Sequence, residues 1–167
     1  MRIEENHALS RRRIGRWDGD LSEVQFTMGY PQWIGLTLHN LHKEAIYITG
    51  VGLFWGKLYR QGNKDEEVPK NELLGVVIEG GAKYTVWACG RSGTSSGTEG
   101  QIELSTNLLE PPHKIPLVNI YWSVPWGSSA NRLEKSRQNE EWLVDLPPIS
   151  QDGAIGEVTV RFQKIKG

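Results

Sequence analysis

The sequence has few of the features that cross-link a small protein or anchor it in a membrane. It has one cysteine in 167 residues, so no disulfide can form within the chain, and Cys89 alone leaves the redox compartment open. No segment approaches the ~20 apolar residues of a membrane-spanning helix. The first residues also lack the apolar stretch of an ordinary secretory signal. We therefore expect a soluble protein, cytoplasmic or released by a non-classical route, that meets any membrane from solution.

An excess of charge of one sign is also lacking. The 19 Lys and Arg residues nearly balance the 20 Asp and Glu residues, giving a formal net charge of −1. The one basic cluster, at residues 11–13, has carboxylates on both sides in the sequence. Such a balance lacks the surplus of positive charge that is typical of a nucleic-acid-binding protein.

Residues suited to catalysis or metal binding are few. His39 and His42 have no glutamate in a zinc-protease spacing, and the acidic run at residues 63–67 lacks the alternating ligands of a calcium loop. Cys89 ends an apolar segment, which favours a buried and inert thiol. We expect no enzymatic activity, no metal and no cofactor, and turnover that required Cys89 or a histidine would overturn this.

Short apolar runs separated by 19 glycines and eight prolines predict an all-β fold. The clearest strand is at the C-terminus, where Val158, Val160 and Phe162 alternate with polar residues. Eight or so strands at this spacing indicate a sandwich or a barrel. The other expected strands are residues 33–40, 44–58, 82–89, 101–106, 115–122 and 141–146, with polar connections at 59–71, 90–100, 108–112, 127–138 and 151–153.

The chain divides into two parts by composition. Residues 1–29 are charged and poor in strand signal, and only Val24, Phe26 and Met28 alternate in a way that could add an edge strand. Residues 30–167 carry the regular strand pattern. We expect one β-domain over residues 30–167, preceded by an extension of unknown role that packs on it or stays apart from it.

Seven tryptophans are more than one core of this size needs. Trp122 ends an apolar run and is expected inside. Trp126 follows Pro125 and precedes Gly127, so it belongs to a turn, where it could pack in the core or face a membrane or a partner. The segment of residues 121–128 is therefore the first candidate for a binding surface.

Several motifs occur in an order that resembles one family. They are Gln32-Trp33, His39-Asn40, Trp55-Gly56-Lys57-Leu58, Gly62-Asn63-Lys64-Asp65, Ala88-Cys89-Gly90-Arg91-Ser92, Tyr121-Trp122, Pro125-Trp126-Gly127-Ser128 and Gly153-Ala154-Ile155-Gly156. Over about residues 30–166 the chain resembles the aegerolysins, small proteins of fungi and some bacteria.

The resemblance implies a two-sheet β-sandwich similar to actinoporins, without enzymatic activity. It also implies binding to membrane sphingolipids, either sphingomyelin, with or without sterol, or ceramide phosphoethanolamine. A larger perforin-like partner, carrying a membrane attack complex/perforin domain, would form the pore, and copies of this chain could assemble on the membrane. The family's membrane-facing tryptophans correspond to Trp33, Trp55 and Trp126.

Polar residues near these rings are the candidates for headgroup contacts. Lys57, Arg91 and Ser92 could bind a phosphate, and Tyr121 could contribute a hydroxyl. Ser96 stands where some members carry a glutamate that helps to read sphingomyelin with cholesterol, and Glu99 follows three residues later. The choice of lipid and the need for sterol therefore stay open.

Two other functions fit the same pattern. Lectin sandwiches also display Trp and Tyr beside polar loops, so a soluble binder of sugars or proteins is the alternative. The chain could also be one half of an insecticidal pair, as some bacterial relatives are, which keeps the membrane mechanism and changes the target.

Overall fold

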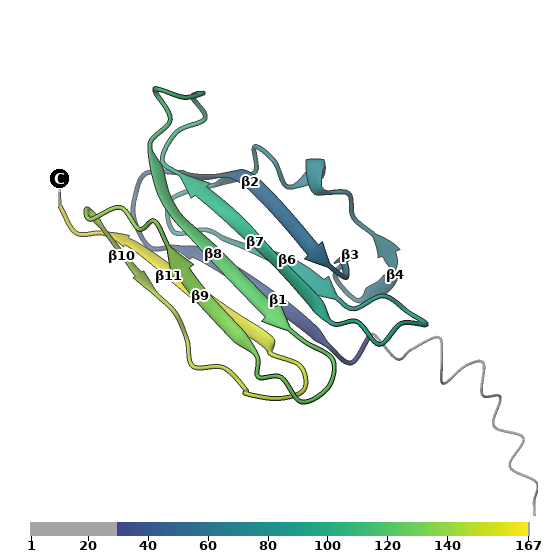
Figure 1. The fold of residues 1–167 in the computed structure, drawn as a ribbon. Helices are drawn as coiled ribbons and strands as arrows, with labels where there is room; N and C mark the ends of the chain where they lie inside the picture. The colour runs from purple at the N-terminus through teal and green to yellow at the C-terminus, as the bar shows by residue number, and fades with distance from the viewer. Residues whose placement is uncertain (1–29, 167) are drawn as a thin grey trace, which may run out of the picture.

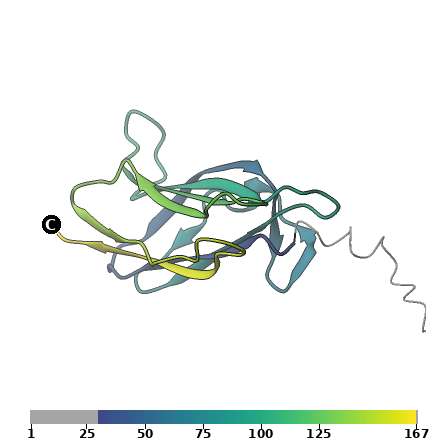
Figure 2. The ribbon, with the colours of Figure 1, turned by 60° about the horizontal axis from the view of Figure 1, so that its bottom comes forward.

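The computed structural model describes residues 30–166, which form two β-sheets packed face to face (Figures 1 and 2). One sheet contains β1 (Trp33–Asn40), β3 (Lys57–Arg60), β4 (Asn63–Glu67), β6 (Lys83–Cys89), β10 (Trp142–Asp145) and β11 (Gly156–Lys164) in the order β10-β11-β1-β6-β3-β4. The other contains β2 (Ile46–Trp55), β5 (Val77–Ile78), β7 (Thr98–Ser105), β8 (Pro116–Val124) and β9 (Arg132–Ser136) in the order β5-β2-β7-β8-β9. The predicted all-β, two-sheet sandwich is confirmed. A single 3₁₀ turn, η1 (Lys70–Glu72), lies between β4 and β5.

The core fills the space between the sheets with alternate residues of each strand. In β11, Val160 and Phe162 are buried while Arg161 is exposed, which confirms the alternation predicted for the last strand. Trp122 of β8 is fully buried, as expected, and its indole Nε1 donates to Thr98 Oγ1 at 3.2 Å. One face of each sheet therefore supplies the apolar interior.

The predicted single strand over residues 44–58 was wrong, because the chain changes sheets at Gly56. Trp55 pairs with Glu99 in the five-stranded sheet, whereas Lys57 pairs with Cys89 in the six-stranded sheet. Gly56 makes the corner with φ +82°, and a Cβ there would lie 2.4 Å from the carbonyl oxygen of Cys89. Glycine is the residue that tolerates both this dihedral and this approach.

Two segments expected as connections contain strands instead. Residues 59–71 include β4, and residues 127–138 include β9. Both are edge strands made largely of charged and polar residues, so they lack the apolar alternation by which strands are recognised. Charged side chains at a sheet edge discourage pairing with another chain. Because the same side chains give these strands the composition of a loop, the sequence pattern predicted connections there.

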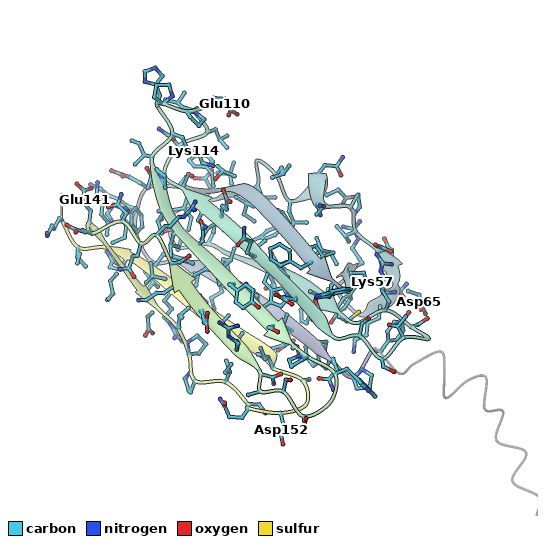
Figure 3. The ribbon with its side chains drawn as sticks, viewed as in Figure 1. Lys57, Asp65, Glu110, Lys114, Glu141 and Asp152 are labelled. Carbon is cyan, nitrogen blue, oxygen red and sulfur yellow. The ribbon has the colours of Figure 1, made fainter. Side chains whose placement is uncertain are left out.

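One end of the sandwich gathers most of the candidate residues. There the last residues of β2, β6 and β8 meet the first residues of β1, β3 and β7. Lys57 and Asp65 lie at this end, whereas Glu110 and Lys114 lie on the connection at the opposite end (Figure 3). We call the first end the tryptophan end, because Trp33, Trp55 and Trp126 belong to it. Among the described residues, no helix is long and apolar enough to cross a bilayer.

Candidate functional site

A hollow of about 340 Å³ opens at the tryptophan end, and we call it the Trp hollow. Trp55 and Trp126 form its aromatic walls, with 63% and 37% of their surfaces exposed. Glu99 also lines the hollow, from β7, which lies between β2 and β8, and it is opposite Trp55 in the strand pairing. The remaining lining residues are Ser96, Gly97, Thr98, Ser123 and Pro125. Two exposed indoles beside a carboxylate make a site for a group that is apolar on its surface and positively charged.

Glu99 is held in place by a neighbouring strand. The hydroxyl of Tyr121 donates to Glu99 Oε1 at 2.7 Å. Partial burial, and after it this hydrogen bond, raise the pKa of Tyr121, so the phenol keeps its proton and remains a donor. On its other side the Tyr121 ring lies 5.3 Å from the guanidinium carbon of Arg132. Tyr121 therefore acts on the hollow through Glu99, since it does not line the hollow itself.

The loop that carries Ser96 packs tightly on the end of β8. A Cβ added to Gly97 would lie 1.8 Å from the carbonyl oxygen of Val124, so only glycine fits there without a shift of backbone. The side-chain amide nitrogen of Gln32 donates to the carbonyl oxygens of Pro125 at 3.3 Å and Gly153 at 2.9 Å. These contacts connect the loops on either side of Pro125, the residue before Trp126.

A second, wider hollow of about 790 Å³ adjoins the first, with Trp55 and Ser96 lining both. Arg91 lines it and forms two hydrogen bonds to Glu67, of 3.0 and 2.8 Å. This bidentate contact lowers the pKa of the Glu67 carboxyl. Both side chains are about half exposed, so the pair contributes at most about 1 kcal/mol to stability. Arg91 can exchange Glu67 for another oxyanion at a small cost.

Five of the predicted residues do not line the Trp hollow: Arg91 and Tyr121, described above, and Lys57, Trp33 and Ser92. Lys57 is buried, and its Nζ donates to the hydroxyl of Tyr30 at 3.1 Å, so a phosphate contact from Lys57 requires that Tyr30 move aside. Trp33 is partly buried and stacks on Trp87 with ring centres 6.1 Å apart. Ser92 lines neither hollow. The lipid-binding roles predicted for all nine candidate residues stay predictions.

Cys89 is buried between β1 and β3, as the sequence predicts. Removal from water raises the pKa of its thiol to about 11. At pH 8 about one thiol in a thousand would then be ionised, and the thiolate is the reactive form.

We therefore expect Cys89 in the native protein to resist iodoacetamide at pH 8. The rate should rise with pH towards about 11, and it should rise by orders of magnitude at pH 8 once the protein is unfolded in guanidinium. Mass spectrometry of the alkylated peptide measures both rates. Rapid labelling of the native protein at pH 8 would contradict the buried placement.

Metal binding finds no support in residues 30–166, which contain no group of three or more His, Cys, Asp or Glu side chains placed to hold an ion.

Sequence reasoning missed several residues that shape the site. Phe54 is 53% exposed beside Trp55 and lines the wider hollow. Two consecutive aromatic residues before a glycine were a usable signal for it. Thr98 and Ser123 gave no such signal, because their place in the Trp hollow depends on the pairing of β7 with β8.

Comparison with known proteins decides the family. The family model described as Aegerolysin matches residues 31–165. The chain belongs to the aegerolysin family. It is similar to Aegerolysin Aa-Pri1 of Cyclocybe aegerita, with 38% identity over 133 residues that cover 78% of this chain and 89% of the relative. It is also similar to Ostreolysin A6 of Pleurotus ostreatus, with 33% identity over 135 residues that cover 80% and 95%.

A solved structure extends the likeness to bacterial members of the fold. IP-1A of Alcaligenes faecalis superposes with a TM-score of 0.71 at 28% identity, covering 86% of this aegerolysin and 96% of that chain. The family match includes every residue that lines the Trp hollow. Residues 1–30 precede it.

Proposed function

We propose that this aegerolysin binds sphingolipids at membrane surfaces, and that the Trp hollow receives the lipid headgroup. The observation that supports this most directly is that Glu99 lines one hollow together with the exposed rings of Trp55 and Trp126. Sphingomyelin ends in a trimethylammonium group and ceramide phosphoethanolamine in an ammonium group. Aromatic faces and a carboxylate attract both cations.

The phosphate of such a lipid lies next to its cationic group. Arg91 lines the wider hollow. Trp55 and Ser96 line both that hollow and the Trp hollow, so Arg91 lies close to the Trp hollow. A guanidinium can hold two phosphate oxygens at once, as that of Arg91 holds the two carboxylate oxygens of Glu67. We assign the phosphate contact to Arg91 and the cationic group to Glu99.

Insertion of the rings alone would give weak binding. If Trp55 and Trp126 together remove about 200 Å² from water, the gain is on the order of 5 kcal/mol at ~25 cal/mol/Å². Loss of translational and side-chain freedom offsets much of that gain. Headgroup contacts supply selectivity, and several copies on one membrane supply tight attachment.

The protein acts, in this proposal, as the lipid-recognition component of a two-component pore-forming cytolysin. A perforin-like partner supplies the membrane-crossing part. If the two roles are divided in this way, the protein alone should bind vesicles without releasing a trapped dye. Dye release by the purified protein would contradict the division of roles.

A liposome panel tests the proposal. Sphingomyelin, ceramide phosphoethanolamine and sterol are varied independently in a phosphatidylcholine background, with sedimentation and tryptophan fluorescence as readouts. Binding that needs a phosphosphingolipid supports the proposal. Equal binding to phosphatidylcholine alone, or no binding to any mixture, would contradict it.

The charge of Glu99 provides a sharper test. We expect Glu99→Gln to weaken binding to the preferred phosphosphingolipid by about tenfold, because the amide keeps the shape and can still accept from Tyr121 while losing the attraction to a cation. The affinity is measured by titrating liposomes into protein. Glu141→Gln is the matched control, since Glu141 pairs with Lys164 at the end of the sandwich opposite the Trp hollow (Figure 3). An equal loss in both variants would assign the effect to net charge.

A second candidate function rests on a different surface. Gln101, Tyr121, Arg132 and Glu134 line a polar hollow of about 390 Å³ on the five-stranded sheet, which suits a soluble glycan. A glycan array distinguishes the two functions, since a glycan bound without any lipid would favour this one.

A further inference from the structure

The side of the sandwich between β3 and β6 is open. The two strands pair only at Lys57 with Cys89 and at Leu58 with Ala88, and then they diverge. From Trp87 back to Lys83, β6 has β1 on one side and no strand of the described chain on the other. Backbone groups along this stretch are therefore available for pairing.

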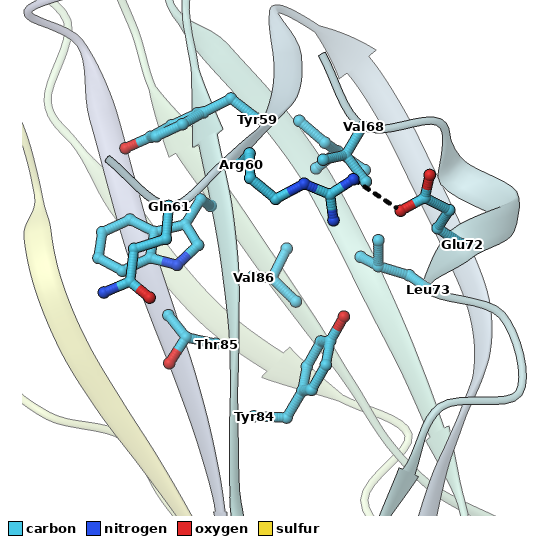
Figure 4. A pocket seen from close by; sticks show the side chains of 11 residues that line it. Tyr59, Arg60, Gln61, Val68, Glu72, Leu73, Tyr84, Thr85 and Val86 are labelled. Atoms are coloured by element: carbon cyan, nitrogen blue, oxygen red, sulfur yellow. Dashed lines mark hydrogen bonds and ion pairs between the residues drawn. The ribbon is translucent and has the colours of Figure 1, made fainter. Parts of the chain in front are cut away.

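A cavity of about 170 Å³ adjoins this free edge (Figure 4). The buried side chains Leu58, Val68, Leu73 and Val86 give it an apolar floor, and aromatic side chains wall it. At its mouth Arg60 Nη2 lies 3.2 Å from Glu72 Oε2, and Figure 4 shows this ion pair beside the cavity. Its volume slightly exceeds the ~150 Å³ of an apolar cavity known to hold a benzene ring.

A free strand edge beside an apolar cavity suits an extended segment of chain. Its backbone pairs with the edge, and one of its alternate side chains enters the cavity. The rim carries polar residues at Arg60, Gln61, Glu72 and Thr85, so the flanking residues of such a segment need to be polar.

Tyr30, the first residue that the structure describes, is bound by Lys64 close to this opening. Lys64 Nζ donates to the carbonyl of Tyr30 at 2.8 Å and lies 5.9 Å from the centre of the Tyr59 ring, which walls the cavity. The hydroxyl of Tyr30 is also hydrogen-bonded to Lys57 and Asp65. Tyr30 is therefore held near the cavity by side chains of β3 and β4.

The sequence of that preceding chain has the required pattern. Val24, Phe26 and Met28 alternate with Gln25 and Thr27, and all five lie outside the described residues. Five residues in extended form span about 17 Å, and only Gly29 separates them from Tyr30. The reach therefore matches the free edge from Lys83 to Trp87.

We propose that residues 24–28 bind in this opening, pairing with the free edge of β6 and placing the Phe26 ring in the cavity. The segment thereby completes the six-stranded sheet on the side that β3 leaves open. It closes an edge at which other chains could pair. This interaction is independent of the Trp hollow and of the proposed lipid binding.

Hydrogen exchange in the full-length protein tests the proposal. The amides of residues 84–87 that point away from β1 should be protected in the natural protein. The double substitution Val24→Asp with Phe26→Asp should raise their exchange rates at least tenfold. The matched control, Gln25→Asp with Thr27→Asp, adds the same charge at the alternate positions and should leave the rates within about twofold. Phe26→Leu should keep most of the protection.

Three results would overturn the proposal. The first is exchange of these amides in the natural protein as fast as in an unstructured peptide. The second is an equal rise in both double variants. The third is protection that grows with protein concentration, which would assign the edge to a second copy of the chain. Near-ultraviolet circular dichroism verifies that each variant keeps the sandwich.

Discussion

Trp126→Ala should abolish binding to sphingolipid liposomes while leaving the thermal midpoint almost unchanged. The indole is 37% exposed and lies on the connection after β8, where it walls the Trp hollow. If it contributes half of the ~200 Å² that the two rings bury in the interface, its loss is worth about 2.5 kcal/mol, or roughly 70-fold in affinity. Liposome sedimentation and a thermal melt measure the two quantities.

Trp122→Ala is the matched control for this prediction. Trp122 is only four residues earlier but fully buried, and its Nε1 is hydrogen-bonded to Thr98. Its removal should lower the free energy of unfolding by about 3–5 kcal/mol. A comparable loss of stability in Trp126→Ala would make Trp126 a core residue and would contradict its assignment to the lipid surface.

Gly97→Ala should destabilise the protein and deform the Trp hollow together. The added methyl group would lie 1.8 Å from the carbonyl oxygen of Val124, a backbone atom that cannot turn aside. Separation of the loop from β8 should lower the free energy of unfolding by about 2–4 kcal/mol. For a domain of this size that corresponds to a fall of roughly 5–15 °C in Tm, measured by differential scanning calorimetry.

Ser96→Ala is the control for Gly97→Ala, because it removes a contact within the same loop and leaves the approach of Gly97 to β8 unchanged. Ser96 precedes Gly97 and lies 2.6 Å, oxygen to oxygen, from the exposed hydroxyl of Thr94. Its substitution should change the unfolding free energy by less than about 0.5 kcal/mol. If Gly97→Ala melted within 2 °C of the natural protein, the close approach of the loop to β8 would be wrong.

Fold class was predictable because alternation is a local property. Val160 and Phe162 face the interior wherever the strand lies in the sandwich, since side chains of one strand alternate between its two faces. Trp122 was likewise recognisable as a core residue from the apolar run that it ends. The edge strands β4 and β9 escaped recognition, since their residues have no apolar face to bury.

The candidate site was predictable only in part. Motif order pointed to Trp55, Ser96, Glu99 and Trp126, and all four line the Trp hollow. The same motifs included Lys57 and Trp33, which do not line that hollow. Lys57 is hydrogen-bonded to Tyr30, and Trp33 stacks on Trp87. Their residue types suited a lipid site, but which side of the strand each faces depends on the change of sheet at Gly56 and on the pairing of β1 with β6.

The all-β class, the absence of an intrachain disulfide and the family motifs could be read from the amino-acid order alone, because composition and spacing carry these directly. The sharing of one hollow by Glu99, Trp55 and Trp126, and the edge of β6 that stays unpaired beside a cavity within the described chain, follow from the three-dimensional arrangement alone. These three site residues come from strand ends or loops far apart in the chain. Their distances therefore depend on strand register and on how the two sheets pack, which no local pattern specifies.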